Sequence, residues 1–261
     1  INVVNDFNLM LKNKSLDVIF ISTRHKDHWQ LTKNALLNKK HVFCEKPLCI
    51  NASELKEIKS FFKKQKVAPI LVTGFNRRFS KSAKILKDFI KESTSPIFLN
   101  YTVNADKLLP NSWIYSREGG GRNIGEACHF YDLIFFLINN NYTNIQVSSI
   151  NSENKDLHKT DNFFVTLKFN NGSVAKLNYT SAGSVNDKKE IIEVRSTGET
   201  LIMENFQKIT LISNNRKKIV YSSKFSDKGY QNQYESFFYN FKLNKFSISI
   251  EEQIEAMNLC F

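Results

Sequence analysis

The stretch from Asp17 to Pro47 constrains the fold more than any other part of this 261-residue chain. It begins with an apolar run, Val18–Ile21, which has the length and β-branched character of a buried strand. A polar turn, a helical pattern and a second short apolar strand follow, over 22–27, 28–38 and 41–44. The second strand leads directly into Glu45-Lys46-Pro47. This order predicts a strand–helix–strand unit of an open parallel sheet, in which ligands bind at the carboxyl ends of the strands.

The alternation of strands and helices covers residues 1–74. A strand end is expected at 2–4, a short helix at 6–12, a helix capped by Asn51 or Ser53, and an apolar strand at 67–73. Such alternation is typical of a parallel sheet with crossover helices. We therefore predict a parallel α/β domain over residues 1–74.

The pattern changes after residue 74. Helices are expected at 79–90, 124–138 and 230–243 and again at the end of the chain, and strands at 97–105, 145–150, 162–169, 173–180, 190–196, 200–203, 208–212 and 217–221. Turn signals separate the strands, as at Asn170-Asn171-Gly172 and Thr197-Gly198. We predict an α+β domain over 75–261, with a large, mostly antiparallel open sheet and the 124–138 helix on one face.

Composition excludes several classes of protein. The net charge of +12 permits phosphate-bearing partners, but the lysines are scattered, so we expect no nucleic-acid partner. No apolar run approaches the roughly 20 residues that cross a bilayer, so no membrane contact is expected. The four cysteines show neither a CxxC pair nor metal-ligand spacing, which indicates reduced thiols, a cytoplasmic location and no metal site.

Glu45-Lys46-Pro47 is the first group of residues that can carry chemistry. A lysine at a strand end can hold a ribose hydroxyl or polarise a substrate hydroxyl, and its pKa falls readily on burial. The proline that follows fixes the turn and is compatible with a cis peptide bond. Taken alone, however, such a lysine is more often a surface residue before a turn.

Three other groups are candidates. The glycines at 119–121 let a ligand approach the backbone, and they precede a helix that holds Arg122, Glu126 and His129. The polar residues after the first strand, Thr23 to His28, can touch a pyrophosphate or a nicotinamide ribose. Arg77 and Arg78 can meet phosphate or carboxylate groups. A GxGxxG loop is absent from the sequence, whose first glycine is Gly74.

Taken together, these segments resemble the Gfo/Idh/MocA family, which includes glucose–fructose oxidoreductase and inositol dehydrogenase. The resemblance is carried by DVIFIST with His28, KKHVFCEKPL, GFNRRF and GGGRNIGEACHFYDL, in that order. The last two, with ISTRHKDH and Asn111 to Trp113, are most similar to a branch in which this module is often fused behind a zinc-type alcohol dehydrogenase-like module.

The resemblance implies a Rossmann domain that binds NAD or NADP, and hydride transfer at a carbon of a sugar, sugar nucleotide or cyclitol. It implies that Lys46 lies near the nicotinamide ribose and the reacting hydroxyl, and that His129 serves as acid–base or hydroxyl contact. It further implies a homo-oligomer through the open sheet. The expected cofactor contacts are Ser22, Thr23, His25, His28, Glu45, Lys46, Pro47 and Arg78. The expected substrate contacts are Trp113, Arg122, Glu126, His129 and Asp132.

Two departures from the family pattern stand out. Gly125 occupies the position where many members have Asp, and Asp132 is the other carboxylate on the face of His129. This loss leaves open the alternative of a non-catalytic nucleotide-binding regulator or scaffold. In addition, the chain aligns from about the third Rossmann strand, without the first βαβ unit. We therefore expect a fragment of a longer protein, which alone binds the dinucleotide poorly.

Overall fold

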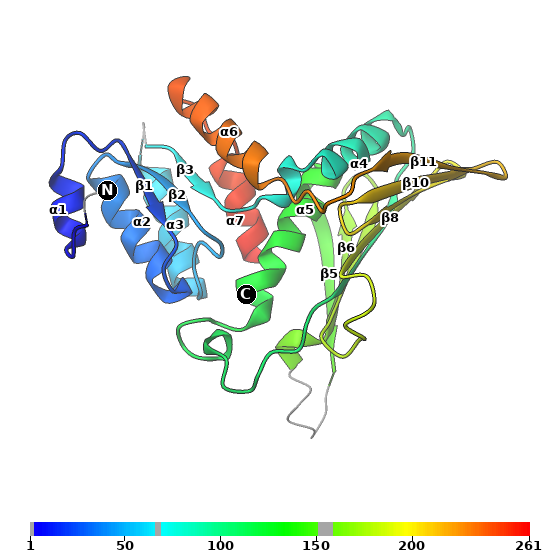
Figure 1. The fold of residues 1–261 in the computed structure, drawn as a ribbon, viewed down its shortest axis with the longest axis horizontal. Coiled ribbons are helices and arrows are strands. Elements are labelled where there is room, and N and C mark those ends of the chain that lie inside the picture. The colour runs from blue at the N-terminus through cyan, green and yellow to red at the C-terminus, as the bar shows by residue number, and fades with distance from the viewer. Residues whose placement is uncertain (1–2, 66–68, 151–158) are drawn as a thin grey trace. The chain divides into compact units, whose positions relative to one another are not determined.

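The computed structural model describes residues 3–65, 69–150 and 159–261 (Figure 1). Its internal contacts divide the chain into two compact units, neither of which is one continuous segment. The first unit comprises Ile1–Phe75, Trp113–Cys128 and Gln233–Phe261, and the second comprises Asn76–Ser112 and His129–Asn232. The units therefore differ from a single division at residue 74, because two later segments pack with the first one.

The first unit is built on a three-stranded parallel sheet in the order β1-β2-β3. Its elements are α1 (Phe7–Lys12), β1 (Val18–Ile21), η1 (His25–Asp27), α2 (His28–Leu37), β2 (His41–Cys44), α3 (Ala52–Lys64), β3 (Leu71–Thr73), η3 (Trp113–Tyr115), η4 (Asn123–Ala127), most of α6 (Tyr230–Lys242) and α7 (Ile250–Asn258). The strands end level, since Ile21 pairs with Cys44 and Cys44 with Thr73. The residues that follow them therefore share one edge of the sheet.

The predicted strand–helix–strand unit is confirmed. Trp29 of α2 is 1% exposed and meets Phe61 of α3 edge-on, with ring centroids 5.9 Å apart. Asn51 caps α3, because its side chain accepts a hydrogen bond from the amide of Glu54 at 2.9 Å. Two expected segments are shorter than predicted: Val3 and Val4 form no strand, and β3 begins at Leu71. Residues 2 and 66–68 lie outside the described part of the chain.

The C-terminal helix α7 joins the first unit through Gln253. The fully buried side chain of Gln253 accepts from the amide and hydroxyl of Thr73, at 2.8 and 2.7 Å, and donates to the carbonyl of Leu71 at 3.0 Å. It thereby satisfies the outer edge of β3, which no further described strand covers. Helix α6 contributes Phe237, whose ring lies 5.8 Å from that of Phe20 on β1. Neither attachment has a local sequence signal.

The second unit contains an eight-stranded sheet in the order β11-β10-β9-β8-β4-β7-β6-β5. Its elements are η2 (Arg77–Phe79), α4 (Lys81–Glu92), β4 (Phe98–Asn104), α5 (Cys128–Ile138), β5 (Tyr142–Ser149), η5 (Lys159–Asp161), β6 (Phe163–Phe169), β7 (Val174–Thr180), β8 (Glu190–Ser196), β9 (Glu199–Glu204), β10 (Lys208–Ser213) and β11 (Arg216–Ser222). The predicted mostly antiparallel sheet is confirmed, and β4 with β7 is its parallel pair. Thr197 and Gly198 have positive φ, as the predicted turn requires.

Helices α4 and α5 cover one face of this sheet (Figure 1). Phe130 of α5 contacts Tyr101 and Tyr179, with ring centroids 5.2 and 5.9 Å apart. Side chains on the opposite face are more exposed, as the alternation along β6 shows: Phe163 is 6% exposed and Phe164 is 51% exposed. Across the described ranges, no helix is long and apolar enough to span a bilayer.

Candidate functional site

The carboxyl edge of the parallel sheet carries the polar residues predicted there. Ser22 and Thr23 follow β1 and are exposed, whereas Glu45 and Lys46 follow β2 and are half-buried. The Lys46–Pro47 peptide bond is cis, the isomer with which the sequence was compatible. The structure therefore brings together the residues that two separate strand ends contribute.

Lys46 is anchored on the segment that precedes α5 in the chain. Its ammonium donates to the carbonyl of Gly125, with an Nζ–O distance of 2.8 Å. An ammonium carries three donors, so two remain for other acceptors. The side chain of Glu45 packs against Gly74. A Cβ added to Gly74 would lie 2.9 Å from Oε2 of Glu45. Burial raises the pKa of Glu45, although the charge of Lys46 acts in the opposite direction.

His28 joins the two strand ends. Its Nδ1 lies 2.7 Å from the carbonyl of Pro47, and its Nε2 lies 3.1 Å from the carbonyl of Thr23. The ring is 1% exposed. Both ring nitrogens thus face backbone oxygens that can only accept, which gives His28 a structural task. Its predicted contact with the cofactor stays a prediction.

His25 is held in a different way. Its Nδ1 lies 2.9 Å from the carbonyl of Gly119, and because a carbonyl only accepts, Nδ1 carries the hydrogen. Its ring meets Trp113 edge-on at 4.7 Å. Burial lowers the pKa of His25 to about 4, the hydrogen bond to Gly119 opposes this, and the charge of Lys46 lowers it further. His25 is therefore neutral at physiological pH.

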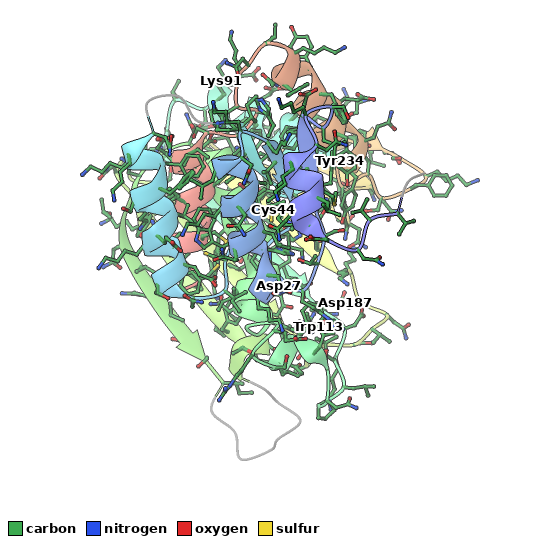
Figure 2. The ribbon with its side chains drawn as sticks, turned by 90° about the vertical axis from the view of Figure 1, so that its left-hand side faces the viewer. Asp27, Cys44, Lys91, Trp113, Asp187 and Tyr234 are labelled. Carbon is green, nitrogen blue, oxygen red and sulfur yellow. The ribbon has the colours of Figure 1, made fainter. Side chains whose placement is uncertain are left out.

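The loop at 113–119 is fastened to the residues around His25. The guanidinium of Arg24 lies 4.2 Å from the centre of the Trp113 ring. The amide of Lys26 donates to the carbonyl of Glu118 at 3.1 Å, and the two side chains form an ion pair. Trp113 accordingly lies near Asp27, the residue that precedes α2 (Figure 2). Trp113, predicted as a substrate contact, packs between two protein side chains, and the substrate contact stays a prediction.

The backbone of the loop itself requires glycine at positions 119–121. A Cβ on Gly119 would lie 2.4 Å from the backbone of Ile114, and Gly120 and Gly121 have φ of 77° and 83°. These constraints come from the loop itself. The close approach of a ligand that the sequence suggested is therefore not needed to explain them.

A π-helical turn, η4, lies between this loop and α5. Such turns are frequent at functional sites, and they place more residues in each turn than an α-helix does. Arg122 is 4% exposed and donates to the Glu126 carboxylate through Nε and Nη2, at 3.0 and 2.7 Å. Gly125 lies against the ring of His25, because a Cβ there would be 2.8 Å from Cε1 and 3.2 Å from Nδ1 of that ring. Substrate contacts by Arg122 and Glu126 stay predictions.

His129, Asp132 and Arg78 belong to the second unit. His129 is 5% exposed. Asp132 is fully buried and accepts from Nε and Nη2 of Arg78, at 3.0 and 2.7 Å. This bidentate pair gives the second arginine of GFNRRF a carboxylate partner inside its own unit. The predicted contacts of Arg78 with the cofactor and of Asp132 with the substrate or with His129 stay predictions.

Arg77 anchors a second buried cluster. Its guanidinium donates to Glu190 through Nε and Nη2, at 2.8 and 2.9 Å, and the Tyr101 hydroxyl also donates to Glu190. Burial alone would raise the pKa of Glu190, but the charge and hydrogen bonds of Arg77 hold it at about 2. The sequence had not singled out Glu190 or Tyr101, which lie 113 and 24 positions from Arg77.

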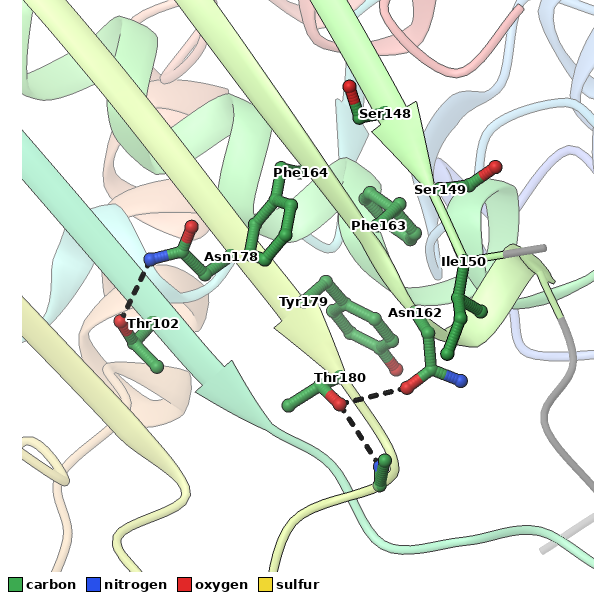
Figure 3. Close-up of a pocket in the computed structure, with 11 residues that line it drawn as sticks. Thr102, Ser148, Ser149, Ile150, Asn162, Phe163, Phe164, Asn178, Tyr179 and Thr180 are labelled. Atoms are coloured by element: carbon green, nitrogen blue, oxygen red, sulfur yellow. Dashed lines mark hydrogen bonds between the residues drawn. The ribbon is translucent and has the colours of Figure 1, made fainter. Parts of the chain in front are cut away.

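The second unit also contains a pocket of about 540 Å³, on the face of the sheet that carries Phe164. Figure 3 shows Thr102 and Asn178 beside one another there, joined by a hydrogen bond of 3.3 Å, with Phe164 on the neighbouring strand. Thr180 donates to Asn162 at 2.8 Å at the end of the same strands. In the described ranges, no group of three or more His, Cys, Asp or Glu residues is placed to hold a metal ion.

Two family models match the chain, one over its N-terminal part and one over its C-terminal part. The model described as "Oxidoreductase family, NAD-binding Rossmann fold" matches residues 1–73, and "Oxidoreductase family, C-terminal alpha/beta domain" matches residues 94–236. The chain belongs to the Gfo/Idh/MocA family of oxidoreductases. This confirms the resemblance and the fold class that the sequence predicted.

Members of the Gfo/Idh/MocA family with curated names match most of the chain. "Uncharacterized oxidoreductase YrbE" of Bacillus subtilis is 28% identical over 214 residues, which are 80% of this chain and 61% of that protein. "Myo-inositol 2-dehydrogenase" of Thermotoga maritima is 26% identical over 208 residues, 78% of this chain and 61% of that protein. The chain thus spans about three fifths of the length of these relatives.

Solved structures confirm the fold. An NAD-binding oxidoreductase from Klebsiella pneumoniae superposes with a TM-score of 0.81 at 16% identity, over 98% of this chain and 79% of that one. UDP-N-acetylglucosamine 3-dehydrogenase from Acidithiobacillus ferrooxidans gives a TM-score of 0.79 at 14% identity, over 98% and 80%.

The residues at the sheet edge suit one half of the NAD(P) cofactor that the Gfo/Idh/MocA family implies. Lys46 and the hydroxyls of Ser22 and Thr23 are groups that hydrogen-bond a ribose and an amide. A glycine-rich phosphate loop is absent from the 261 residues. The donor set at the ends of β1 and β2 therefore fits the nicotinamide half of the cofactor.

Proposed function

We propose that the chain is part of an NAD(P)-dependent dehydrogenase that acts on a CH–OH group of a sugar, sugar nucleotide or cyclitol. The observation that carries this proposal is the position of Lys46 at the carboxyl edge of the parallel sheet. Its ammonium is fixed 2.8 Å from the carbonyl of Gly125 and keeps two donors for a ligand.

Lys46 has two tasks in this proposal. One remaining N–H group donates a hydrogen bond to a hydroxyl of the nicotinamide ribose. The other donates a hydrogen bond to the oxygen of the reacting hydroxyl. A positive charge beside that oxygen stabilises the negative charge that develops on it during oxidation. The backbone anchor on Gly125 limits the freedom of the side chain, so that less entropy is lost when a ligand binds.

His129 is proposed as the group that takes the hydroxyl proton in oxidation and returns it in reduction. Histidine is the side chain that most often transfers protons in enzyme active sites. Bound NAD or NADP supplies the acceptor or donor of the hydride. The names of the relatives support this class of substrate, since one acts on myo-inositol and a fold neighbour on a UDP-amino sugar.

The test uses the protein as its gene encodes it, with NAD or NADP and a panel of cyclitols, sugars and sugar nucleotides. Formation of reduced nicotinamide is followed for the wild type and for Lys46→Ala and His129→Ala. Loss of turnover in each variant supports the assignment, and turnover that survives in both contradicts it. Tight cofactor binding without turnover on any substrate would instead favour a non-catalytic nucleotide-binding regulator or scaffold.

We also propose that the protein forms a homo-oligomer through the open face of the eight-stranded sheet. Phe98 and Phe164 are 49% and 51% exposed there, and they alternate with residues that face the helices. The pocket of about 540 Å³ hollows the same face. Exposed aromatic side chains beside a concave surface are typical of a contact region. The four cysteines are buried thiols that form no disulfide, which supports a cytoplasmic location for this oligomer.

A further inference from the structure

His25 has an acceptor atom that the protein itself leaves unused. Its Nδ1 carries the hydrogen donated to Gly119, so Nε2 holds a lone pair. Among the described residues, none donates to this Nε2, and the atom is not one of the fully buried polar atoms that lack a partner. The residue as a whole is only 7% exposed. A nearly buried ring therefore presents a single acceptor at the surface of the site.

His25 and Lys46 meet at the same backbone position. The Lys46 ammonium binds the carbonyl of Gly125, and Cε1 of His25 lies 2.8 Å from the position that a Cβ on Gly125 would take. The two side chains are close enough for the charge of Lys46 to influence the imidazole. One side chain offers donors and the other offers an acceptor.

Three contacts fix the orientation of the His25 ring. The bond to Gly119 sets which nitrogen carries hydrogen, Trp113 packs edge-on against the ring, and Gly125 lies against the Cε1 and Nδ1 atoms. If the His25 ring only filled space, the nitrogen that carries its hydrogen would not need to be fixed. A fixed tautomer keeps the lone pair on Nε2, where it can accept a hydrogen bond from a ligand hydroxyl.

We propose that Nε2 of His25 accepts a hydrogen bond from a ligand hydroxyl at the Lys46 site, and that the glycine at 125 provides the space for its ring. The hydroxyl belongs either to the nicotinamide ribose or to the polyol substrate. His25 is a binding residue in this proposal, and the proton transferred in the reaction does not pass to it. The proposal rests on the proposed function, since it names a further contact of the same site.

Two substitutions separate the two nitrogens of His25. Asn places its amide nitrogen near the position of Nδ1, so His25→Asn keeps a donor for the Gly119 carbonyl but has no acceptor at the ε position. Gln reaches the ε position, so His25→Gln keeps an acceptor there and loses the donor to Gly119. Thermal unfolding of each variant shows whether it is folded at the assay temperature.

Binding is measured by calorimetry on the protein as its gene encodes it, with nicotinamide mononucleotide and with AMP, and KM is measured for the polyol that the wild type turns over. A lost hydrogen bond of about 1.4 kcal/mol corresponds to roughly tenfold weaker binding. A roughly tenfold loss for nicotinamide mononucleotide in His25→Asn, with AMP unchanged, assigns the hydroxyl to the ribose. A roughly tenfold rise in KM with unchanged cofactor binding assigns it to the substrate. In either case the loss in His25→Gln, which keeps an acceptor at the ε position, is smaller than the loss in His25→Asn.

The result that overturns the proposal is a folded His25→Asn protein with unchanged binding of both ligands. Equal losses in both variants also overturn it, because ring packing then explains the effect. If His25→Asn does not fold, ¹⁵N spectra of ring-labelled wild-type protein decide. Hydrogen on Nδ1 at neutral pH, with a shift of the Nε2 signal on addition of nicotinamide mononucleotide or of the polyol, supports the proposal. Hydrogen on Nε2, or no shift with either ligand, contradicts it. A failure of this kind with Lys46→Ala still inactive leaves the proposed function intact.

Discussion

The ring of His25 occupies the space that a side chain on residue 125 would need, with 2.8 Å between His25 Cε1 and the position of a Cβ on Gly125. The residues are 100 positions apart in the chain. In this chain the ring of His25 therefore occupies the space of a side chain at residue 125. This exchange accounts for the absence of a carboxylate at that position. Gly125 alone is therefore weak support for a non-catalytic protein.

This exchange predicts that the effect of Gly125→Ala changes sign with residue 25. In the wild-type background the added methyl group overlaps the ring, and we expect a loss of about 1–3 kcal/mol in the free energy of unfolding. In a His25→Ala background the space is free, and replacing a helical glycine stabilises by roughly 0.5–1 kcal/mol. Chemical denaturation of the four proteins measures the coupling. Additive effects of the two substitutions would contradict the packing described here.

Stability should depend on the protonation of His25. Its folded pKa of about 4 lies below the ordinary value of 6.5, so the neutral form is favoured in the folded state. The contribution is fully present above pH 6.5 and is lost as the pH falls towards 4. After an allowance for solvent screening, we expect a decrease on the order of 1–2 kcal/mol over this range. Denaturation at several pH values checks it, and His25→Asn should flatten the slope in this window.

Glu190 provides a test of the second unit. Its side chain is 1% exposed and pairs with Arg77, so Glu190→Gln leaves a buried guanidinium without its countercharge, and we expect a loss of about 3–5 kcal/mol. Glu193 pairs with Arg195 at the surface, and Glu193→Gln is the matched control, with an effect within about 1 kcal/mol. Equal effects of the two substitutions in chemical denaturation would show that the buried pair is not important for stability.

The same carboxylate predicts an acid limit. The folded pKa of Glu190, about 2, lies below the ordinary value of 4.5. Its stabilising contribution is therefore complete above pH 4.5 and decreases as the pH falls towards 2. We expect the difference in unfolding free energy between wild type and Glu190→Gln to shrink over this range. A difference that stays constant from pH 5 to pH 2 would contradict the ionised pair.

The open face of the sheet predicts a change in oligomeric state. Phe164→Lys places a charge on this face, so we expect dissociation of the oligomer in analytical ultracentrifugation. Phe225→Lys is the control, because Phe225 is 72% exposed in the chain after β11 and lies off the sheet. An unchanged sedimentation coefficient in Phe164→Lys would place the contact elsewhere.

The elements themselves were predictable because their signals are local. Alternating apolar residues defined β6 and β7, and the turn at Thr197-Gly198 marked the hairpin between β8 and β9. The strand–helix–strand unit and Lys46 at its end followed from the order of the patterns. The π-helical turn at η4 has no comparable signature, since i→i+5 bonding depends on tertiary packing more than on local preference.

The pairings across the chain could not be predicted from local patterns. Gln253 binds the edge of β3 from 180 positions away, so the last helix returns to the first unit instead of extending the second. Arg78 meets Asp132, and the contact of His25 with Gly125 links a turn to a helix. Each depends on how distant segments fold together, and a single sequence contains no periodicity that reports such pairs.

The most direct test of the central claim is the turnover of Lys46→Ala and of His129→Ala in the protein as its gene encodes it, measured with NAD or NADP and the best polyol of the panel. The account predicts that each variant stays folded and that its kcat/KM falls at least roughly a hundredfold, as is typical when a group that moves or stabilises a proton is removed. Folded variants that both turn over at the wild-type rate would contradict it.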